Sequence, residues 1–229
     1  MVGTPGRLVE LVRRRYLTLD KLRHFVIDEC DKVLSTERMR ADVQEIFTKT
    51  PLSKQVMMFS ATMPEETKEI AKKFMTHRVD IFIDEGKLVL HGLTQYYVIV
   101  EEKQKLAKLV HILDTIPFNQ VIVFMNKIER AKRLHALLCQ KLFNPICLHS
   151  NLSQIDRIEN FDRFKNNDAR ILIATDLVGR GIDIERVNLV INYDFPFERN
   201  TYLHRVGRAG RFATKGTNIN FIRPEKDPL

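Results

Sequence analysis

Apolar residues follow two alternating patterns along the whole chain. Short continuous apolar runs predict strands buried on both faces of a parallel sheet. We expect strands at residues 25–28, 56–59, 79–83, 96–100, 121–124, 146–149, 171–174, 189–191 and 217–222. Apolar residues spaced three and four apart predict helices between them. We expect helices at residues 8–15, 37–48, 64–74, 106–113, 128–138, 153–165 and 198–206. This alternation predicts an α/β fold with doubly wound parallel sheets.

The alternation is interrupted at residues 84–92, a stretch of mixed charge that contains glycines. Such a stretch is typical of a linker. We therefore expect a first domain over residues 1–84, a linker over 85–93 and a second domain over 94–229. The first half has only about three strand signals, whereas a sheet usually has about four to six strands. We expect the first domain to be incomplete and the second to be nearly complete.

The composition is that of a globular protein, because 44% of the 229 residues are hydrophobic and 29% are charged. The three cysteines have irregular spacing, which favours reduced thiols over a disulfide framework or a zinc site. We find no long uncharged apolar run, so no contact with a membrane is expected. The net charge of +8 is compatible with a polyanionic partner.

The stretch with the clearest chemistry is Asp28-Glu29-Cys30-Asp31, directly after the expected strand at residues 25–28. Open α/β sheets bind ligands at the carboxyl ends of their strands. Adjacent carboxylates there suit Mg²⁺, which proteins usually hold through one or two carboxylates together with substrate phosphates. The same residues are also compatible with the acidic start of a solvated helix.

Two further groups have candidate chemistry. Ser60 and Thr62 place hydroxyls at the end of a strand, where they could instead cap the helix that begins at Pro64. Arg208 and Arg211 are three residues apart, so on a helical turn they share a face. Their guanidinium groups suit bidentate phosphate binding, and the alternative is a solvated basic surface.

Several short motifs occur together in the order and spacing of a DEAD-box RNA helicase of superfamily 2. They are Asp28–Asp31, Ser60–Thr62, residues 174–183, residues 204–211, Thr4–Arg7 and Gln154–Arg157. The resemblance covers essentially the whole chain. It implies two RecA-like domains, with ATP and Mg²⁺ as cofactors and RNA as partner. Cys30 stands where this family usually has alanine, as in the DECD-box subgroup. That subgroup implies a nuclear location and partner proteins of mRNA splicing and nuclear export.

The resemblance assigns roles in the first domain. Asp28 would hold Mg²⁺ through water, and Glu29 would orient and deprotonate the attacking water, as phosphoryl transfer requires. The residues that would couple hydrolysis to strand separation are Ser60, Thr62, Asp31 and His204. From the residues alone, Asp31 could equally cap a helix or join a network with Ser60 or His204.

The resemblance also assigns roles in the second domain. Arg208 and Arg211 would be arginine fingers for the γ-phosphate, Asp183 would contact the ribose, and Gly181 would permit a tight loop. Arg205 would be structural or coupling. The RNA contacts would come from Thr4, Arg7, Gln154, Arg157, Thr175 and Arg180. Since phosphate contacts hold RNA without reading its sequence, we expect binding to a single strand or short duplex without sequence preference.

The chain contains no Gly-x-x-x-x-Gly-Lys-Ser/Thr phosphate loop. In the resembling family this loop lies upstream of Thr4, so we expect the chain to be an N-terminally truncated fragment. One interpretation is an ATP-dependent RNA helicase that is active as the intact parent and inactive as the isolated chain. The alternative is an ATP-incompetent fragment that binds RNA or a partner. The residue types of the Asp28–Asp31 motif disfavour a DNA helicase of the same superfamily.

Overall fold

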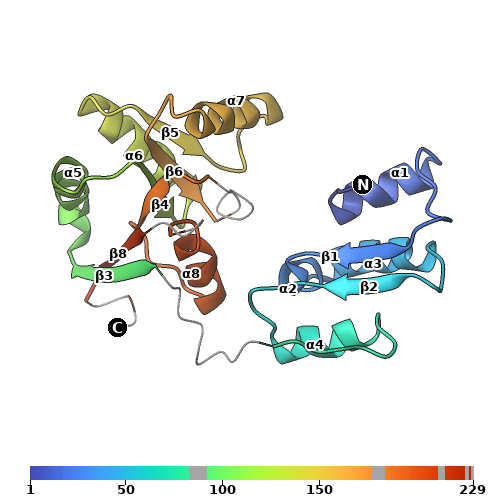
Figure 1. The fold of residues 1–229 in the computed structure, drawn as a ribbon. Helices are drawn as coiled ribbons and strands as arrows, with labels where there is room; N and C mark the ends of the chain where they lie inside the picture. Colours follow the sequence, from blue (N-terminus) through green and yellow to red (C-terminus); the bar gives the residue numbers. More distant parts are fainter. Residues whose placement is uncertain (83–91, 177–183, 211–214, 225–226, 228–229) are drawn as a thin grey trace. The chain divides into compact units, whose positions relative to one another are not determined.

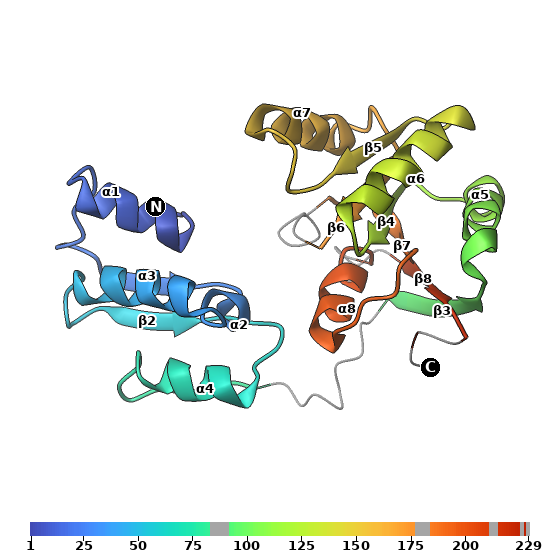
Figure 2. The same cartoon turned by 180° about the vertical axis from the view of Figure 1, so that it is seen from behind.

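The computed structural model describes residues 1–82, 92–176, 184–210, 215–224 and 227. The chain divides into two compact units, residues 1–83 and 84–229, each described here by itself. Figure 1 and Figure 2 show the elements of both units from two sides. None of the described helices combines the length and apolarity that a membrane crossing requires.

The first unit contains a parallel pair of strands and four helices. The strands are β1 (His24–Ile27) and β2 (Gln55–Met58), with Ile27 opposite Met58. The helices are α1 (Pro5–Arg13), α2 (Cys30–Val33), α3 (Glu37–Thr48) and α4 (Glu65–Lys72). The buried core of this unit consists of Ile27, Cys30, Leu34, Val43, Ile70 and Phe74. Because the strands are parallel, the segments after β1 and β2 begin at the same edge of the pair.

Two sequence predictions for this unit are wrong. Residues 79–82 form no strand, and Ile83 lies outside the described residues. A strand needs a neighbour for its backbone, and the described sheet of this unit pairs only β1 with β2. The strands are also not buried on both faces, because Val26 is 54% and Phe59 55% exposed. Alternate residues point to opposite faces, and the core covers the face that contains Ile27.

The second unit is built on a fully parallel six-stranded sheet in the order β3-β8-β7-β4-β6-β5. Its strands are β3 (Leu93–Ile99), β4 (Gln120–Met125), β5 (Pro145–Leu148), β6 (Ile171–Thr175), β7 (Val187–Asn192) and β8 (Gly216–Ile222). Its helices are α5 (Lys105–Thr115), α6 (Ile128–Gln140), α7 (Gln154–Lys165) and α8 (Arg199–Val206), with a short 3₁₀ turn, η2 (Glu102–Gln104). Leu93, which we expected in the linker, begins β3.

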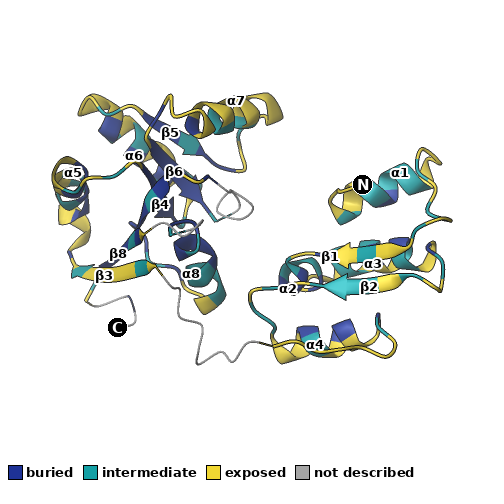
Figure 3. Cartoon of the chain, viewed as in Figure 1, coloured by how far each residue is buried: buried dark blue, intermediate teal, exposed yellow. Residues whose placement is uncertain are grey.

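Helices cover both faces of this sheet. Along β4, Val121 and Val123 pack with α5 and α6 in one core cluster. Ile122 and Phe124 pack with Phe164 of α7 in a second cluster. Every residue of β4 and β6 is buried, as Figure 3 shows for the centre of the sheet. The predicted doubly wound parallel sheet is therefore confirmed for this unit.

Candidate functional site

The acidic stretch of the first unit forms a tight turn at the carboxyl end of β1. Glu29 has φ 48° and ψ 46°, a left-handed conformation that costs a non-glycine residue roughly 1–2 kcal/mol. The Asp28 Oδ1 atom accepts a hydrogen bond from the Glu29 N–H at 2.9 Å. The Cys30 N–H donates to the Phe59 carbonyl oxygen at 3.1 Å and ties the turn to the end of β2. Backbone strain of this kind clusters at functional sites.

A side-chain hydrogen bond joins the segments that follow the two strands. Thr62 Oγ1 donates to Asp31 Oδ2 at 2.8 Å, and Asp31 is buried in α2. Helix α4 has Pro64 at its N-cap and no side-chain cap, so neither Ser60 nor Thr62 caps it. The capping alternative is therefore wrong for these hydroxyls. The buried Asp31 also contradicts a purely solvated helix start.

Cys30 lies between these carboxylates as a packing residue. Its side chain is buried in the core of the first unit, and its Sγ atom lies 3.9 Å from Met63 Sδ. Burial, followed by the charge of Asp31, raises the pKa of the Cys30 thiol. Cys30 is therefore a neutral thiol at physiological pH.

The turn at Asp28 could contribute one carboxylate to a magnesium ion whose other ligands are water and substrate phosphates. Asp28 is exposed at the strand end, and its Oδ1 atom is engaged by the Glu29 N–H. Within the described ranges, no group of three or more His, Cys, Asp or Glu side chains could hold a metal ion. A single carboxylate fits Mg²⁺ that keeps several waters and is bound chiefly through substrate phosphates. Asp28 would hold such an ion, which would neutralise phosphate oxygens when bound.

In the second unit, Arg205 of α8 joins the carboxyl ends of three strands. Its side chain is 1% exposed. Its guanidinium donates to Asp176 Oδ1 at 2.5 Å, Asn126 Oδ1 at 2.7 Å, the Asp194 carbonyl oxygen at 2.7 Å and Asn192 Oδ1 at 3.2 Å. These acceptors lie at or just after the ends of β6, β4 and β7. Arg205 therefore positions these strand ends, and its coupling role stays a prediction.

The next arginine, Arg208, lies in the turn that follows α8. It is buried, and its Nε atom donates to the His204 carbonyl oxygen at 3.0 Å. His204 is also buried, on the last turn of α8. A buried guanidinium is not part of a solvated surface, so that alternative is wrong for Arg208. The described residues do not include four of the predicted site residues, Arg180, Gly181, Asp183 and Arg211.

The predicted RNA contacts of the first unit lie at the start of α1. Thr4 is the exposed N-cap of this helix, and its side chain makes no capping hydrogen bond. Arg7 forms an exposed ion pair with Glu10, with 2.6 Å between Nη1 and Oε2. An exposed ion pair of this kind contributes little to stability. The Arg7 guanidinium is therefore able to exchange Glu10 for a phosphate at small cost.

The predicted RNA contacts of the second unit lie on two neighbouring strand ends. Gln154 begins α7, which follows β5 and is capped by Ser153. Arg157 is half-buried one turn later, and its Nη2 atom donates to the Ser150 carbonyl oxygen at 3.1 Å. Thr175 is buried at the end of β6, which pairs with β5. The structure thus brings Gln154, Arg157 and Thr175 to the same edge of one sheet.

Two family models match the chain in the same order as the motifs. A DEAD/DEAH box helicase model matches residues 1–70, and a helicase conserved C-terminal domain model matches residues 104–213. The chain belongs to the DEAD-box helicase family. The predicted RecA-like domains are confirmed, because the similar solved structures are DEAD-box helicases with this fold.

Relatives of this DEAD-box chain are similar to it over almost its whole length. DEAD-box ATP-dependent RNA helicase 15 of Arabidopsis thaliana is 54% identical over 228 residues, which cover 99% of this chain and 53% of that protein. ATP-dependent RNA helicase uap56 of Schizosaccharomyces pombe is 53% identical, with 99% and 52% covered. Among solved structures, S. cerevisiae Dbp5 bound to RNA and ADP BeF3 is 29% identical, with a TM-score of 0.90, 98% of this chain and 59% of that chain covered. The chain thus spans about half the length of the curated relatives it matches.

A charge cluster beside Arg205 of this DEAD-box chain has no signature in the sequence. Lys105 is fully buried, and its Nζ atom donates to the Tyr193 carbonyl oxygen at 2.9 Å. The Nζ atom also lies 3.6 Å from Asp194 Oδ1, and Arg130 Nη2 lies 2.6 Å from the same oxygen. Glu102 pairs with both Lys105 and Arg130. These residues come from separate helices and strand ends, so no local motif identifies them.

We expect this cluster to make the second unit sensitive to acid. Burial raises the pKa of Asp194, but hydrogen bonds and charges from Arg130, the Asn126 N–H and Lys105 outweigh it. The pKa of Asp194 therefore lies below its ordinary value of 3.8. A lowered folded-state pKa contributes stability that is present above pH 3.8 and is lost as pH falls through the folded value. Urea unfolding between pH 7 and about pH 2.5 should show this loss.

The matched variants are Asp194→Asn in the cluster and Asp162→Asn on the exposed surface of α7. Asp194→Asn should flatten the acid limb of the stability profile, whereas Asp162→Asn should leave it unchanged. An acid limb of equal slope in wild type and Asp194→Asn would contradict this account.

Proposed function

We propose that the chain is the part of an ATP-dependent RNA helicase that binds RNA, orients the attacking water and contacts the γ-phosphate. The observation that carries this proposal is the strained turn at Glu29, beside Asp28 and next to the Asp31–Thr62 hydrogen bond. Membership of the DEAD-box family supports it. The relatives named above are ATP-dependent RNA helicases, and the Dbp5 structure holds RNA and ADP BeF3.

The proposed chemistry is hydrolysis of ATP coupled to local RNA unwinding. Glu29 accepts the proton of the attacking water, and Asp28 is the residue that would hold Mg²⁺. Arg208 and Arg211 contact the γ-phosphate, where guanidinium groups stabilise developing charge. The nucleotide-binding residues would be Asp183 and Gly181. The coupling residues would be Ser60, Thr62, Asp31 and His204.

The proposed RNA-binding residues are Thr4, Arg7, Gln154, Arg157, Thr175 and Arg180. We further propose a nuclear role in mRNA splicing and export, with proteins of those processes as partners. The cysteine at position 30 and the 53% identity to the relative named uap56 support this assignment. Dbp5 has also been solved with Gle1, so a related fold does bind protein partners.

One observation favours a second candidate function, in which the chain binds RNA or a partner without hydrolysing ATP. Its sequence contains no phosphate loop. Such a loop supplies the backbone N–H groups and the lysine that hold the β- and γ-phosphates. The isolated chain is therefore proposed to bind RNA but to hydrolyse ATP negligibly.

Replacing Arg157 with alanine should weaken RNA binding by the chain about tenfold, which corresponds to about 1.4 kcal/mol. The dependence of affinity on salt should also become shallower by about one unit of slope, because one phosphate contact is lost. Fluorescence anisotropy with a labelled oligouridylate, repeated at several salt concentrations, measures both quantities.

The matched control is Arg163→Ala, which removes the same charge from an exposed position near the other end of α7. We expect this control to bind within about twofold of wild type, since surface charges away from the site act weakly through solvent. Equal affinities of wild type and Arg157→Ala, with both proteins folded, would overturn the proposed RNA site.

A further inference from the structure

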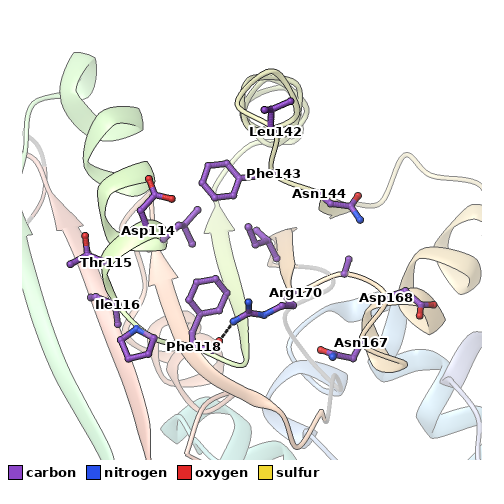
Figure 4. A pocket seen from close by; sticks show the side chains of 14 residues that line it. Asp114, Thr115, Ile116, Phe118, Leu142, Phe143, Asn144, Asn167, Asp168 and Arg170 are labelled. Carbon is purple, nitrogen blue, oxygen red and sulfur yellow. Dashed lines mark hydrogen bonds between the residues drawn. The ribbon is translucent and has the colours of Figure 1, made fainter.

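The second unit contains a pocket at the amino ends of its strands, opposite to the strand ends that Arg205 joins. Three loops form it, those between α5 and β4, between α6 and β5, and between α7 and β6. Its volume is about 650 Å³, within the range of pockets that bind ligands. Figure 4 shows the lining side chains, none of which has a role in the proposed nucleotide or RNA site.

Two aromatic rings line the pocket beside polar and charged side chains. Phe118 and Phe143 are half-buried, and Figure 4 shows both among the side chains that line the pocket. Both pack against the core cluster of α5 and α6. Arg170 covers one wall, with its guanidinium carbon 4.7 Å from the centre of the Phe118 ring. Its donors are directed at the carbonyl oxygens of Asn119 and Phe118, so its side chain is fixed along the wall.

Leu142 lies at the edge of the pocket, and both its exposure and its backbone conformation are unfavourable for a leucine. It is 95% exposed, and its φ is 63°. It occupies the left-handed position of a Schellman motif at the end of α6, in which the Phe143 N–H donates to the Leu138 carbonyl oxygen at 3.1 Å. Glycine or asparagine normally takes this position. Leu142 therefore keeps an exposed apolar side chain on a backbone conformation that costs a non-glycine residue roughly 1–2 kcal/mol.

A second helix end in the same pocket, that of α7, can be compared with the helix end at Leu142. Helix α7 ends in the same motif, in which the Asp168 N–H donates to the Arg163 carbonyl oxygen at 2.9 Å. Asn167 takes the left-handed position there, with φ 70°. Asparagine adopts this conformation at a lower energetic cost than leucine. The backbone geometry therefore does not require leucine at position 142.

The outward charges of the pocket are negative. Asp114 and Asp168 are exposed, and in Figure 4 they lie on opposite sides of the two aromatic rings. Neither carboxylate forms an ion pair with any residue that the structure describes. Arg170, the cation of the pocket lining, is held by main-chain oxygens. The pocket thus presents an apolar centre between two carboxylates.

We propose that this pocket binds a peptide segment of a partner protein, in which an apolar side chain is flanked by basic residues. The apolar side chain packs against Phe118, Phe143 and Leu142. The basic residues on either side pair with Asp114 and Asp168. This docking site goes beyond the proposed helicase function, since none of its residues belongs to that machinery.

Selection from a phage library of random dodecapeptides, with the complete 229-residue chain as target, tests the proposal. Enriched peptides should contain an apolar residue with lysine or arginine on both sides. In nuclear magnetic resonance titrations, the enriched peptide should shift the amide signals of residues 116–118, 142–144 and 167–171. Enrichment of acidic peptides, or shifts confined to other residues, would overturn the proposal.

The decisive variants are Leu142→Gly and Leu142→Asn, which suit the left-handed backbone and remove the apolar side chain. Both should fold at least as stably as wild type and bind the enriched peptide at least fivefold more weakly. Asp114→Asn with Asp168→Asn should weaken binding to a similar degree, and more strongly at low salt. Unchanged affinity in these variants, or equal shifts of the pocket amides by an oligouridylate, would overturn the assignment to a peptide.

Discussion

Replacing Arg205 with alanine is expected to lower the free energy of unfolding of the second unit by about 3–5 kcal/mol. The Arg205 guanidinium is 1% exposed and donates to Asp176, Asn126, Asn192 and the Asp194 carbonyl oxygen. Its removal leaves the buried Asn192 amide oxygen and the Asp194 carbonyl oxygen without their donor and the half-exposed Asp176 carboxylate without its ion pair, which together are more costly than the loss of one surface ion pair. Hydrogen exchange measured by mass spectrometry on peptides from β4, β6 and β7 reports this unit separately from the first.

The matched control for this prediction is Arg133→Ala, which removes an exposed arginine from α6. Surface substitutions of this kind usually change stability by no more than about 0.5 kcal/mol. The free energy of unfolding of Arg205→Lys should lie between those of wild type and Arg205→Ala, because one ammonium group cannot make all the hydrogen bonds of a planar guanidinium. A loss below about 1 kcal/mol in Arg205→Ala would show that these contacts do not position the strand ends.

Replacing Glu29 with glutamine should lower RNA-stimulated ATP hydrolysis by about 10²–10⁴-fold, the usual contribution of a general base. The change must be made in a protein that can bind ATP. A suitable protein is a chimera that joins this chain to the parts of the Arabidopsis thaliana relative that it does not cover. The KM for ATP should change little, because Glu29 is proposed to act on water and not on the nucleotide.

Glu37→Gln is the matched control, since it makes the same change at an exposed position in the first turn of α3. It should leave the rate of hydrolysis unchanged. A loss of less than tenfold in Glu29→Gln would exclude Glu29 as the base. A rise in KM with unchanged kcat would instead place Glu29 in nucleotide binding.

The fold was predictable where the spacing of apolar residues along a segment matches the burial of that segment's own helix or strand. The apolar runs at β4, β6 and β7 are buried on both faces, as their composition predicts. Residues 79–82 are also mostly apolar, with Asp80 among them, but they form no strand, because pairing depends on a neighbouring strand that periodicity does not reveal. Val26 was predicted to be buried but is exposed, for a related reason. Its side of the strand would be buried only if another part of the chain packed against it.

The order of the elements predicts which side chains of the candidate site lie near one another, but not their detailed geometry. Carboxylates after β1 and hydroxyls after β2 can be placed at one sheet edge from the order of the elements. The left-handed backbone of Glu29 and the hydrogen bond from Thr62 to Asp31 cannot be predicted from the sequence, because neither produces a recognisable local sequence pattern. The partners of Arg205 lie 11 to 79 residues away in sequence. A leucine in place of glycine after α6, at position 142, is visible in the sequence, but its left-handed backbone is not.

We propose that the chain binds RNA and holds the water-orienting carboxylate but does not turn over ATP, because its sequence contains no phosphate loop. RNA-stimulated ATP hydrolysis by the isolated chain, with Glu29→Gln as reference, tests it most directly. We predict RNA binding with hydrolysis no faster than in Glu29→Gln. RNA-stimulated hydrolysis that disappears in Glu29→Gln would contradict the claim, because the chain would then complete its own nucleotide site.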